Sequence, residues 1–210
     1  MSSLFLPGWG APGALYRSGL PEGWAALDPP PFGRAKPSFG SYLVWLLAEL
    51  DALREPVALG GHSMGGALAL AAAARRPDRV RRLVLVSPAG LPLVKPIRRS
   101  LGDFAGQLAA RRYPAGQARP AAVAALRAPR AAWRLACSVR GLDLSAEMRR
   151  VRAAAIDTTV VACSTDTLVT VGHCRRAAAL LGARYRELSL EGGHMWMLDA
   201  WPRLAAELSA

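Results

Sequence analysis

Short runs of apolar residues alternate along the chain with longer segments in which apolar positions follow a helical spacing. The short runs predict six strands, at residues 3–7, 24–28, 56–61, 81–88, 158–164 and 184–190. The longer segments predict helices at residues 38–53, 65–77, 171–182 and 199–210. Because parallel strands need crossover connections, this alternation predicts an α/β fold, in which helices cover both faces of a mostly parallel sheet of about six strands.

Residues 91–153 interrupt the alternation between the fourth and fifth strands. They contain several helical patterns separated by prolines at positions 96, 114, 120 and 129. A chain of 210 residues favours one domain over two. We therefore interpret residues 91–153 as a helical lid inserted into a core made of residues 1–90 and 154–210.

The net charge of +12 is concentrated in the lid. Residues 91–153 contain Lys95 and twelve arginines against three acidic residues, so they carry +10, and the rest of the chain carries +2. Coding bias toward arginine can explain much of the total. No nucleic-acid recognition motif accompanies the charge, so nucleic-acid binding is disfavoured.

The cysteines and the apolar runs indicate the cellular compartment in which the protein is expected. Cys137, Cys163 and Cys174 are odd in number and show no CxxC spacing, which suggests neither a disulfide framework nor a zinc site. No apolar run approaches the ~20 residues that span a bilayer, and the start MSSLFLPGWG lacks the features of a secretory signal. These patterns predict a cytoplasmic protein.

The segment GGHSMGG places Ser63 where a strand turns directly into a helix. Gly61 and Gly65 leave room for the two limbs of such a turn to pass each other. The turn would expose the Ser63 hydroxyl at the carboxyl edge of the sheet, beside the free N–H groups of a helix that begins at Met64. The spacing fits neither a dinucleotide-binding nor a phosphate-binding glycine loop. A serine that merely caps the helix is the alternative interpretation.

A serine nucleophile needs a histidine base, and the chain has three histidines. His62 is adjacent to Ser63, and its side chain should point away from it. His173 falls within the predicted helix 171–182. His194, in the glycine-rich loop after the last strand, lies at the same edge of the sheet as Ser63 and is the candidate base.

The base in turn needs an acid that orients it, at the end of another strand. Asp166 follows the strand 158–164 at the carboxyl edge. Asp157 begins that strand at the opposite edge, Asp28 belongs to a proline-rich turn, and Asp143 lies in the lid. Asp166 is therefore the candidate acid.

Four segments in this order resemble signature regions of the α/β-hydrolase superfamily: GHSMGG, RVRRLVLVSPAG, STDTLVT and GGHMWMLDAWPRLAAEL. The resemblance covers nearly the whole chain and the order of the three candidates matches that of the superfamily. It implies a serine hydrolase with Ser63 as nucleophile, Asp166 as orienting acid and His194 as base.

The same resemblance implies an oxyanion hole. The superfamily often has His-Gly-x-Gly after an early strand, and LPGWG is the similar segment here. Trp9 then matches one backbone N–H donor and Met64 the other. Pro7 stands where the superfamily often has histidine, and the two antiparallel strands with which the superfamily commonly begins are missing.

This reading implies hydrolysis of a carboxylic ester or thioester through an acyl-enzyme, with no metal or organic cofactor. An aspartate-dependent dehalogenase or epoxide hydrolase is disfavoured because Ser63 occupies the nucleophile position. A carbon–carbon bond hydrolase, a lyase or an inactive binding module stay as alternatives. PGWG and the lid are also similar to pimeloyl-acyl-carrier-protein methyl ester esterases. That similarity implies a small-molecule ester or thioester substrate and, as a carrier that the basic lid would attract, an acidic acyl carrier protein or coenzyme A.

Overall fold

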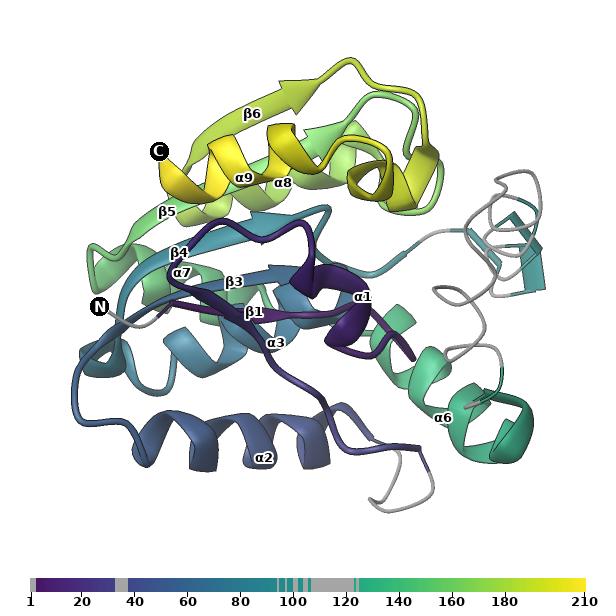
Figure 1. Ribbon diagram of the computed structural model, residues 1–210, viewed down its shortest axis with the longest axis horizontal. Coiled ribbons are helices and arrows are strands. Elements are labelled where there is room, and N and C mark those ends of the chain that lie inside the picture. The colour runs from purple at the N-terminus through teal and green to yellow at the C-terminus, as the bar shows by residue number, and fades with distance from the viewer. Residues whose placement is uncertain are drawn as a thin grey trace.

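The computed structural model describes residues 3–32, 38–93 and 125–210, together with residues 95, 96, 98, 99, 102, 103, 106 and 123. Six strands form one sheet in the order β2-β1-β3-β4-β5-β6, and every neighbouring pair is parallel. This confirms the predicted parallel sheet (Figure 1). The strands are β1 (Ser3–Leu6), β2 (Trp24–Ala26), β3 (Val57–His62), β4 (Val80–Val86), β5 (Asp157–Cys163) and β6 (Arg184–Leu188).

The four predicted helices are present with shifted ends. The second of them stops at Ala73 instead of residue 77, because Pro77 opens a separate 3-10 turn, η1 (Pro77–Arg79). The short helix α1 and the 3-10 helix η2 were not predicted. The helices are α1 (Ala14–Arg17), α2 (Phe39–Asp51), α3 (Met64–Ala73), α6 (Pro129–Arg140), α7 (Ser145–Ala153), α8 (Val171–Leu181), η2 (Gly193–Leu198) and α9 (Trp201–Ser209).

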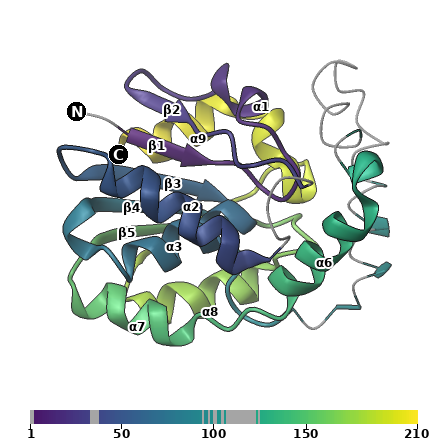
Figure 2. The same ribbon diagram turned by 90° about the horizontal axis from the view of Figure 1, so that it is seen from below.

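Alternate residues of the central strands face two separate cores. In β4, Leu83 and Leu85 pack into the core beneath α2, α3, α7 and α8, whereas Val84 and Val86 pack into the core beneath α1, η2 and α9. Figure 2 shows these two groups of helices on opposite sides of the sheet. A central parallel strand that is buried on both faces has few polar positions, which explains the continuous apolar runs in the sequence.

The carboxyl ends of the strands point toward α6, which lies beyond that edge of the sheet in both views (Figures 1 and 2). Helix α6 is anchored by Ala132, Leu135 and Val139, which join the larger core. Helix α7 contacts α3 and α8. These contacts do not fix the ends of the lid, so its boundaries at residues 91 and 153 remain a prediction. Much of this segment, including Arg111, Arg112 and Arg119, lies outside the described residues. Within the described part of the chain, no helix is long and apolar enough to cross a bilayer.

Candidate active site

Ser63 is the single residue between β3 and α3, and its backbone is strained. Its φ of 54° and ψ of −117° lie in a region that residues with a side chain rarely adopt. Neighbouring backbone groups hold it there: the Ser63 N–H donates to the Val86 carbonyl at 3.0 Å, and the Ser63 carbonyl accepts from the Ala89 N–H at 3.0 Å. The Ser63 side chain makes no capping hydrogen bond to α3, which argues against the helix-capping interpretation.

The two glycines that flank this turn occupy positions where a side chain would collide with backbone. A Cβ atom at Gly61 would lie 2.4 Å from the carbonyl carbon of Gly65. A Cβ atom at Gly65 would lie 2.3 Å from the Leu6 carbonyl oxygen. Helix α3 can therefore pass close to β1 and β3 only because both positions lack a side chain.

Asp166 and His194 form a buried pair at the carboxyl edge. The Nδ1 atom of His194 lies 2.8 Å from Oδ2 of Asp166, and both side chains are almost completely buried. The other carboxylate oxygen, Oδ1, accepts from the backbone N–H groups of Leu168 and Val169, each at 2.9 Å. Burial alone would raise the pKa of Asp166, but the neighbouring His194 and these hydrogen bonds together lower the pKa below its usual value.

His194 lies in η2, where an irregular loop was expected. Gly192 and Gly193 adopt positive φ angles of 126° and 58°, which lets the chain turn back over the sheet. The following Met195 and Trp196 are buried in the second core, and they draw this short helix inward. A histidine in a glycine-rich loop is usually exposed, but here only 2% of His194 is accessible.

The loop after β1 lies directly against the Ser63 turn. A Cβ atom at Gly8 would lie 3.5 Å from the Cβ atom of Ser63. Although Pro7 replaces the usual histidine, two hydrogen bonds anchor this loop. The Gly8 N–H donates to the Tyr16 hydroxyl at 3.3 Å, and the Trp9 indole Nε1–H donates to the Ala132 carbonyl in α6 at 3.2 Å.

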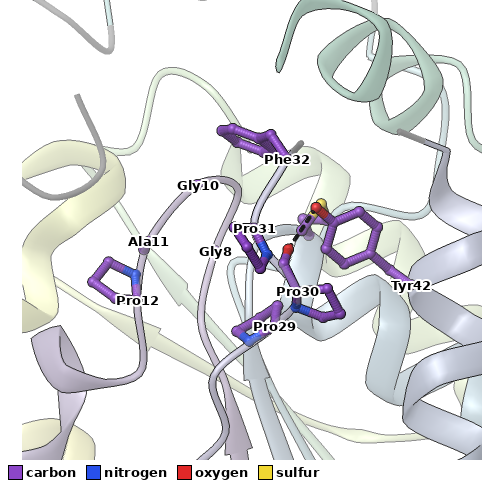
Figure 3. Close-up of a pocket in the computed structure, with 10 residues that line it drawn as sticks. Gly8, Gly10, Ala11, Pro12, Pro29, Pro30, Pro31, Phe32 and Tyr42 are labelled. Carbon is purple, nitrogen blue, oxygen red and sulfur yellow. Dashed lines mark hydrogen bonds between the residues drawn. The ribbon is translucent and has the colours of Figure 1, made fainter. Parts of the chain in front are cut away.

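A pocket of about 120 Å³ opens beside the predicted oxyanion donors. Figure 3 shows that the loop after β1 and the proline-rich turn before α2 form its walls, and that Tyr42 reaches in from α2. The Tyr42 hydroxyl donates to the Pro30 carbonyl at 2.9 Å, and burial raises the pKa of this hydroxyl. Among the residues that the structure describes, none that lines the pocket is charged; they are Gly8, Gly10, Ala11, Pro12, Pro29, Pro30, Pro31, Phe32, Tyr42 and Met64.

Sequence reasoning missed three residues that hold this site together. The Thr165 hydroxyl donates to the Leu190 carbonyl at 2.7 Å and accepts from the Gly193 N–H at 3.1 Å, so it joins the Asp166 loop to the His194 loop. His62 and Tyr16 hydrogen-bond to each other at 2.9 Å beneath the site. His62 was set aside only because it neighbours Ser63, and no pattern in the sequence singles out Tyr16 or Thr165.

Ser63 follows β3, Asp166 follows β5 and His194 follows β6, so all three lie at one edge of the parallel sheet. A model of the Alpha/beta hydrolase family matches residues 4–207, and the chain therefore belongs to that family. No curated protein sequence matches the chain significantly. Among the described residues, no group of three or more histidine, cysteine or acidic side chains is placed to hold a metal ion.

Solved structures of hydrolases share the fold at low sequence identity. Est816, an N-acyl homoserine lactone degrading enzyme, is 21% identical with a TM-score of 0.80, and the match covers 100% of this chain and 92% of that one. The esterase EaEST from Exiguobacterium antarcticum is 17% identical with a TM-score of 0.77, over 100% and 92% of the two chains. The thioesterase domain from the curacin biosynthetic pathway is 22% identical with a TM-score of 0.66, over 100% and 90%.

Proposed function

We propose that this protein is a serine hydrolase that cleaves a carboxylic ester or thioester through an acyl-enzyme intermediate. The observation that carries the proposal is the buried Asp166–His194 pair at the same edge as the strained Ser63. The rings of His194 and His62 lie 4.6 Å apart between centroids, and His62 immediately precedes Ser63 in the chain, which supports a position of the base near the nucleophile. The esterase and thioesterase among the similar structures also support the proposal.

In the first half of the reaction, the Ser63 hydroxyl oxygen attacks the carbonyl carbon of the substrate. Because Asp166 accepts from Nδ1 of His194, Nε2 is the ring atom that takes the Ser63 proton. The carbonyl oxygen becomes negative, and the backbone N–H groups of Trp9 and Met64 would donate to it. His194 then gives the proton to the departing alcohol or thiol, which leaves an ester between Ser63 and the acyl group.

The second half repeats these roles with water. His194 takes a proton from a water molecule whose oxygen attacks the acyl-enzyme carbonyl, and it returns a proton to the Ser63 oxygen as the carboxylic acid departs. Asp166 stays ionised and stabilises the imidazolium form of His194 in both halves, in agreement with its lowered pKa.

The pocket beside Met64 supports a substrate in which the group on one side of the scissile bond is short and uncharged. Its volume of about 120 Å³ is below that of an apolar cavity of roughly 150 Å³ that holds benzene in another protein. By that comparison, a chain of about five carbon atoms or fewer would fit this space. Three consecutive prolines in its wall, Pro29, Pro30 and Pro31, restrict adjustment to a larger group.

Labelling of Ser63 by a fluorophosphonate tests the proposed function. The wild-type protein should be labelled at Ser63 and should hydrolyse p-nitrophenyl esters, and Ser63→Ala should lose both properties. The alternative of an inactive binding module requires that neither reaction occurs in the wild-type protein. Full hydrolysis by Ser63→Ala would instead reject Ser63 as the nucleophile.

We also propose that the positive charge of the lid attracts an anionic substrate carrier, such as an acyl carrier protein or coenzyme A. This part of the proposal rests on the charge of the lid alone. Arg127, Arg130 and Arg134 are exposed beyond the carboxyl edge of the sheet. Salt should lower kcat/KM for a carrier-bound acyl chain more than for a neutral ester of the same chain, because the Debye length shortens from ~10 Å at 0.1 M to ~3 Å at 1 M. Equal salt responses, or an unaffected triple glutamate variant of these arginines, would reject the attraction.

A further inference from the structure

A completely buried histidine ring, His62, lies beneath the proposed catalytic residues and has no part in the acyl-transfer steps. Its Nε2 atom lies 3.0 Å from the His194 carbonyl oxygen, and its Nδ1 atom lies 2.9 Å from the Tyr16 hydroxyl oxygen. The ring also packs against the ring of His194 at a tilt of 41°. Each of its two nitrogen atoms therefore takes part in a hydrogen bond.

The hydrogen-bond partners determine which nitrogen atom of His62 carries the proton. A carbonyl oxygen can only accept, so the bond to His194 requires a hydrogen on Nε2. Burial, with a smaller effect from the nearby His194, lowers the pKa of His62 to about 3, and the ring is neutral at physiological pH. In a neutral ring the second nitrogen has no hydrogen, so Nδ1 accepts from the Tyr16 hydroxyl.

The chain of hydrogen bonds continues from Tyr16 to the loop that carries Trp9. The Tyr16 oxygen, which donates its hydrogen to His62, accepts from the Gly8 N–H at 3.3 Å. The direction of every bond is fixed: Gly8 donates to Tyr16, Tyr16 donates to His62, and His62 donates to the His194 carbonyl. This series connects the loop of a proposed oxyanion donor to the backbone of the proposed base.

We propose that His62, in its neutral form with the proton on Nε2, is a positioning residue that fixes His194 and the Gly8–Trp9 loop relative to Ser63. It is attached to Ser63 by the peptide bond, to His194 through the carbonyl, and to the oxyanion loop through Tyr16. This inference rests on the proposed serine hydrolase function. Its physical basis is that a displacement of ~1 Å in a catalytic group can lower the rate roughly 100-fold.

The neutral form of His62 also avoids electrostatic repulsion of the positive charge that His194 acquires during the reaction. The titratable groups that face its ring are Tyr16, His194 and Asp166. When His194 takes the proton from Ser63, a positive charge develops in a ring centred 4.6 Å from His62. A charged His62 would repel that imidazolium in a buried environment, whereas the neutral ring does not.

Tyr16→Phe is the mildest test, since it removes only the hydroxyl and keeps the ring that packs on Phe5 and Trp201. His62→Leu removes both hydrogen bonds of the ring, and His62→Gln can restore a donor to the His194 carbonyl. Thr158→Val is the matched control, because it removes one buried hydroxyl that donates to the Ile156 carbonyl at 2.8 Å, at the opposite edge of the sheet.

Each variant is assayed for kcat and KM with p-nitrophenyl butyrate, and all rates are divided by the concentration of Ser63 that a fluorophosphonate labels. We expect Tyr16→Phe to lower kcat about 10-fold and His62→Leu about 100-fold, with KM within about twofold of the wild type. His62→Gln should recover part of the loss. Thr158→Val should keep the wild-type kcat per labelled site even where its melting temperature falls.

A structural role alone would reduce the melting temperature and the labelled fraction but not kcat per labelled site. An unchanged kcat in Tyr16→Phe, or a raised KM with unchanged kcat, would overturn the proposal, and Tyr16→Phe decides this even if His62→Leu does not fold. Failure of the proposed function is a different result, namely a wild-type protein that neither reacts with the fluorophosphonate nor hydrolyses the ester.

Discussion

The indole of Trp9 donates a hydrogen bond to the Ala132 carbonyl at 3.2 Å, so the loop after β1 is attached to helix α6 beyond the sheet edge. The same indole packs on the ring of Phe32, with 5.3 Å between ring centroids. Since Phe32 lines the pocket, one side chain contacts both the pocket wall and α6. The position of α6 and the geometry of the proposed oxyanion loop should therefore depend on each other.

Trp9→Phe tests this dependence. It keeps an aromatic ring against Phe32 and the backbone N–H, but it removes the Nε1 donor. We expect kcat/KM for a short ester to fall about 3- to 10-fold, as the loss of a hydrogen bond worth about 1 kcal/mol predicts, and cleavage of α6 by trypsin to become faster. Trp133→Phe, at an exposed position of α6, is the control and should change neither measurement.

The turn at Ser63 gives a steric prediction. Gly65→Ala places a Cβ atom 2.3 Å from the Leu6 carbonyl oxygen, and backbone cannot move aside as a flexible side chain can. We expect a loss of several kcal/mol in unfolding free energy, or insoluble protein, from strain of this kind.

Gly40→Ala is the matched control for Gly65→Ala. Gly40 lies in α2, and the nearest atom to its added Cβ is the Ser38 Oγ at 4.0 Å. Alanine there should stabilise the helix by up to about 1 kcal/mol. Denaturant unfolding of both variants distinguishes a tight turn from a general intolerance of alanine, and a stable Gly65→Ala protein with wild-type activity would contradict the observed close packing.

Much of the fold could be predicted because buried parallel strands leave strong local patterns. The strand that ends before Ser63 and the strand that ends before Asp166 are short apolar runs, and parallel order places both ends at one edge of the sheet. The sequence alone therefore predicts that Ser63, Asp166 and His194 lie at the same edge of the sheet. A cytoplasmic location and the limits of the lid stay predictions.

The contacts beneath the site could not be predicted, because they join distant segments through side chains. Tyr16 lies in a helix of only four residues, too short to show a helical period, and its hydroxyl reaches His62 across 46 positions. The burial of His194 depends on the packing of Met195 and Trp196 in the second core. Such contacts follow from tertiary packing, on which the local sequence pattern carries no information.

Acid should destabilise the protein through His62. An unfolded histidine has a pKa of 6.5, but burial lowers the pKa of His62 to about 3, so below pH 6.5 the unfolded state binds a proton that the folded state does not. Stability is therefore lost as the pH falls from 6.5 toward 3. One such group predicts a loss of about 2 to 3 kcal/mol between pH 7.5 and pH 4.5.

Urea unfolding of the wild type and of His62→Gln at these two pH values measures this contribution. The variant should be less stable at pH 7.5 but should lose less stability on acidification. Burial also lowers the pKa of His173, which acts in the same direction, so some loss should remain in the variant. Asp166, whose pKa is lowered on folding from the usual 3.8, loses most of its contribution below pH 4.5 and adds little within this window. Equal losses in both proteins would show that His62 is not the source.

The pocket predicts a limit on chain length that one residue sets. Phe32 is buried, lines the pocket and approaches Gly10, where an added Cβ would lie 3.0 Å from its ring. The value of kcat/KM for p-nitrophenyl esters should peak at acyl chains of about two to five carbon atoms, because an apolar cavity of roughly 150 Å³ is filled by benzene and this pocket is smaller.

Phe32→Ala should move the peak by several carbon atoms toward longer chains. Phe39→Ala, which alters a buried phenylalanine outside the pocket lining, is the control and should lower stability without moving the peak. The ratio of kcat/KM for octanoate to that for butyrate makes the comparison independent of the amount of folded enzyme. A ratio that does not change in Phe32→Ala would mean that the group bound during hydrolysis does not occupy this pocket.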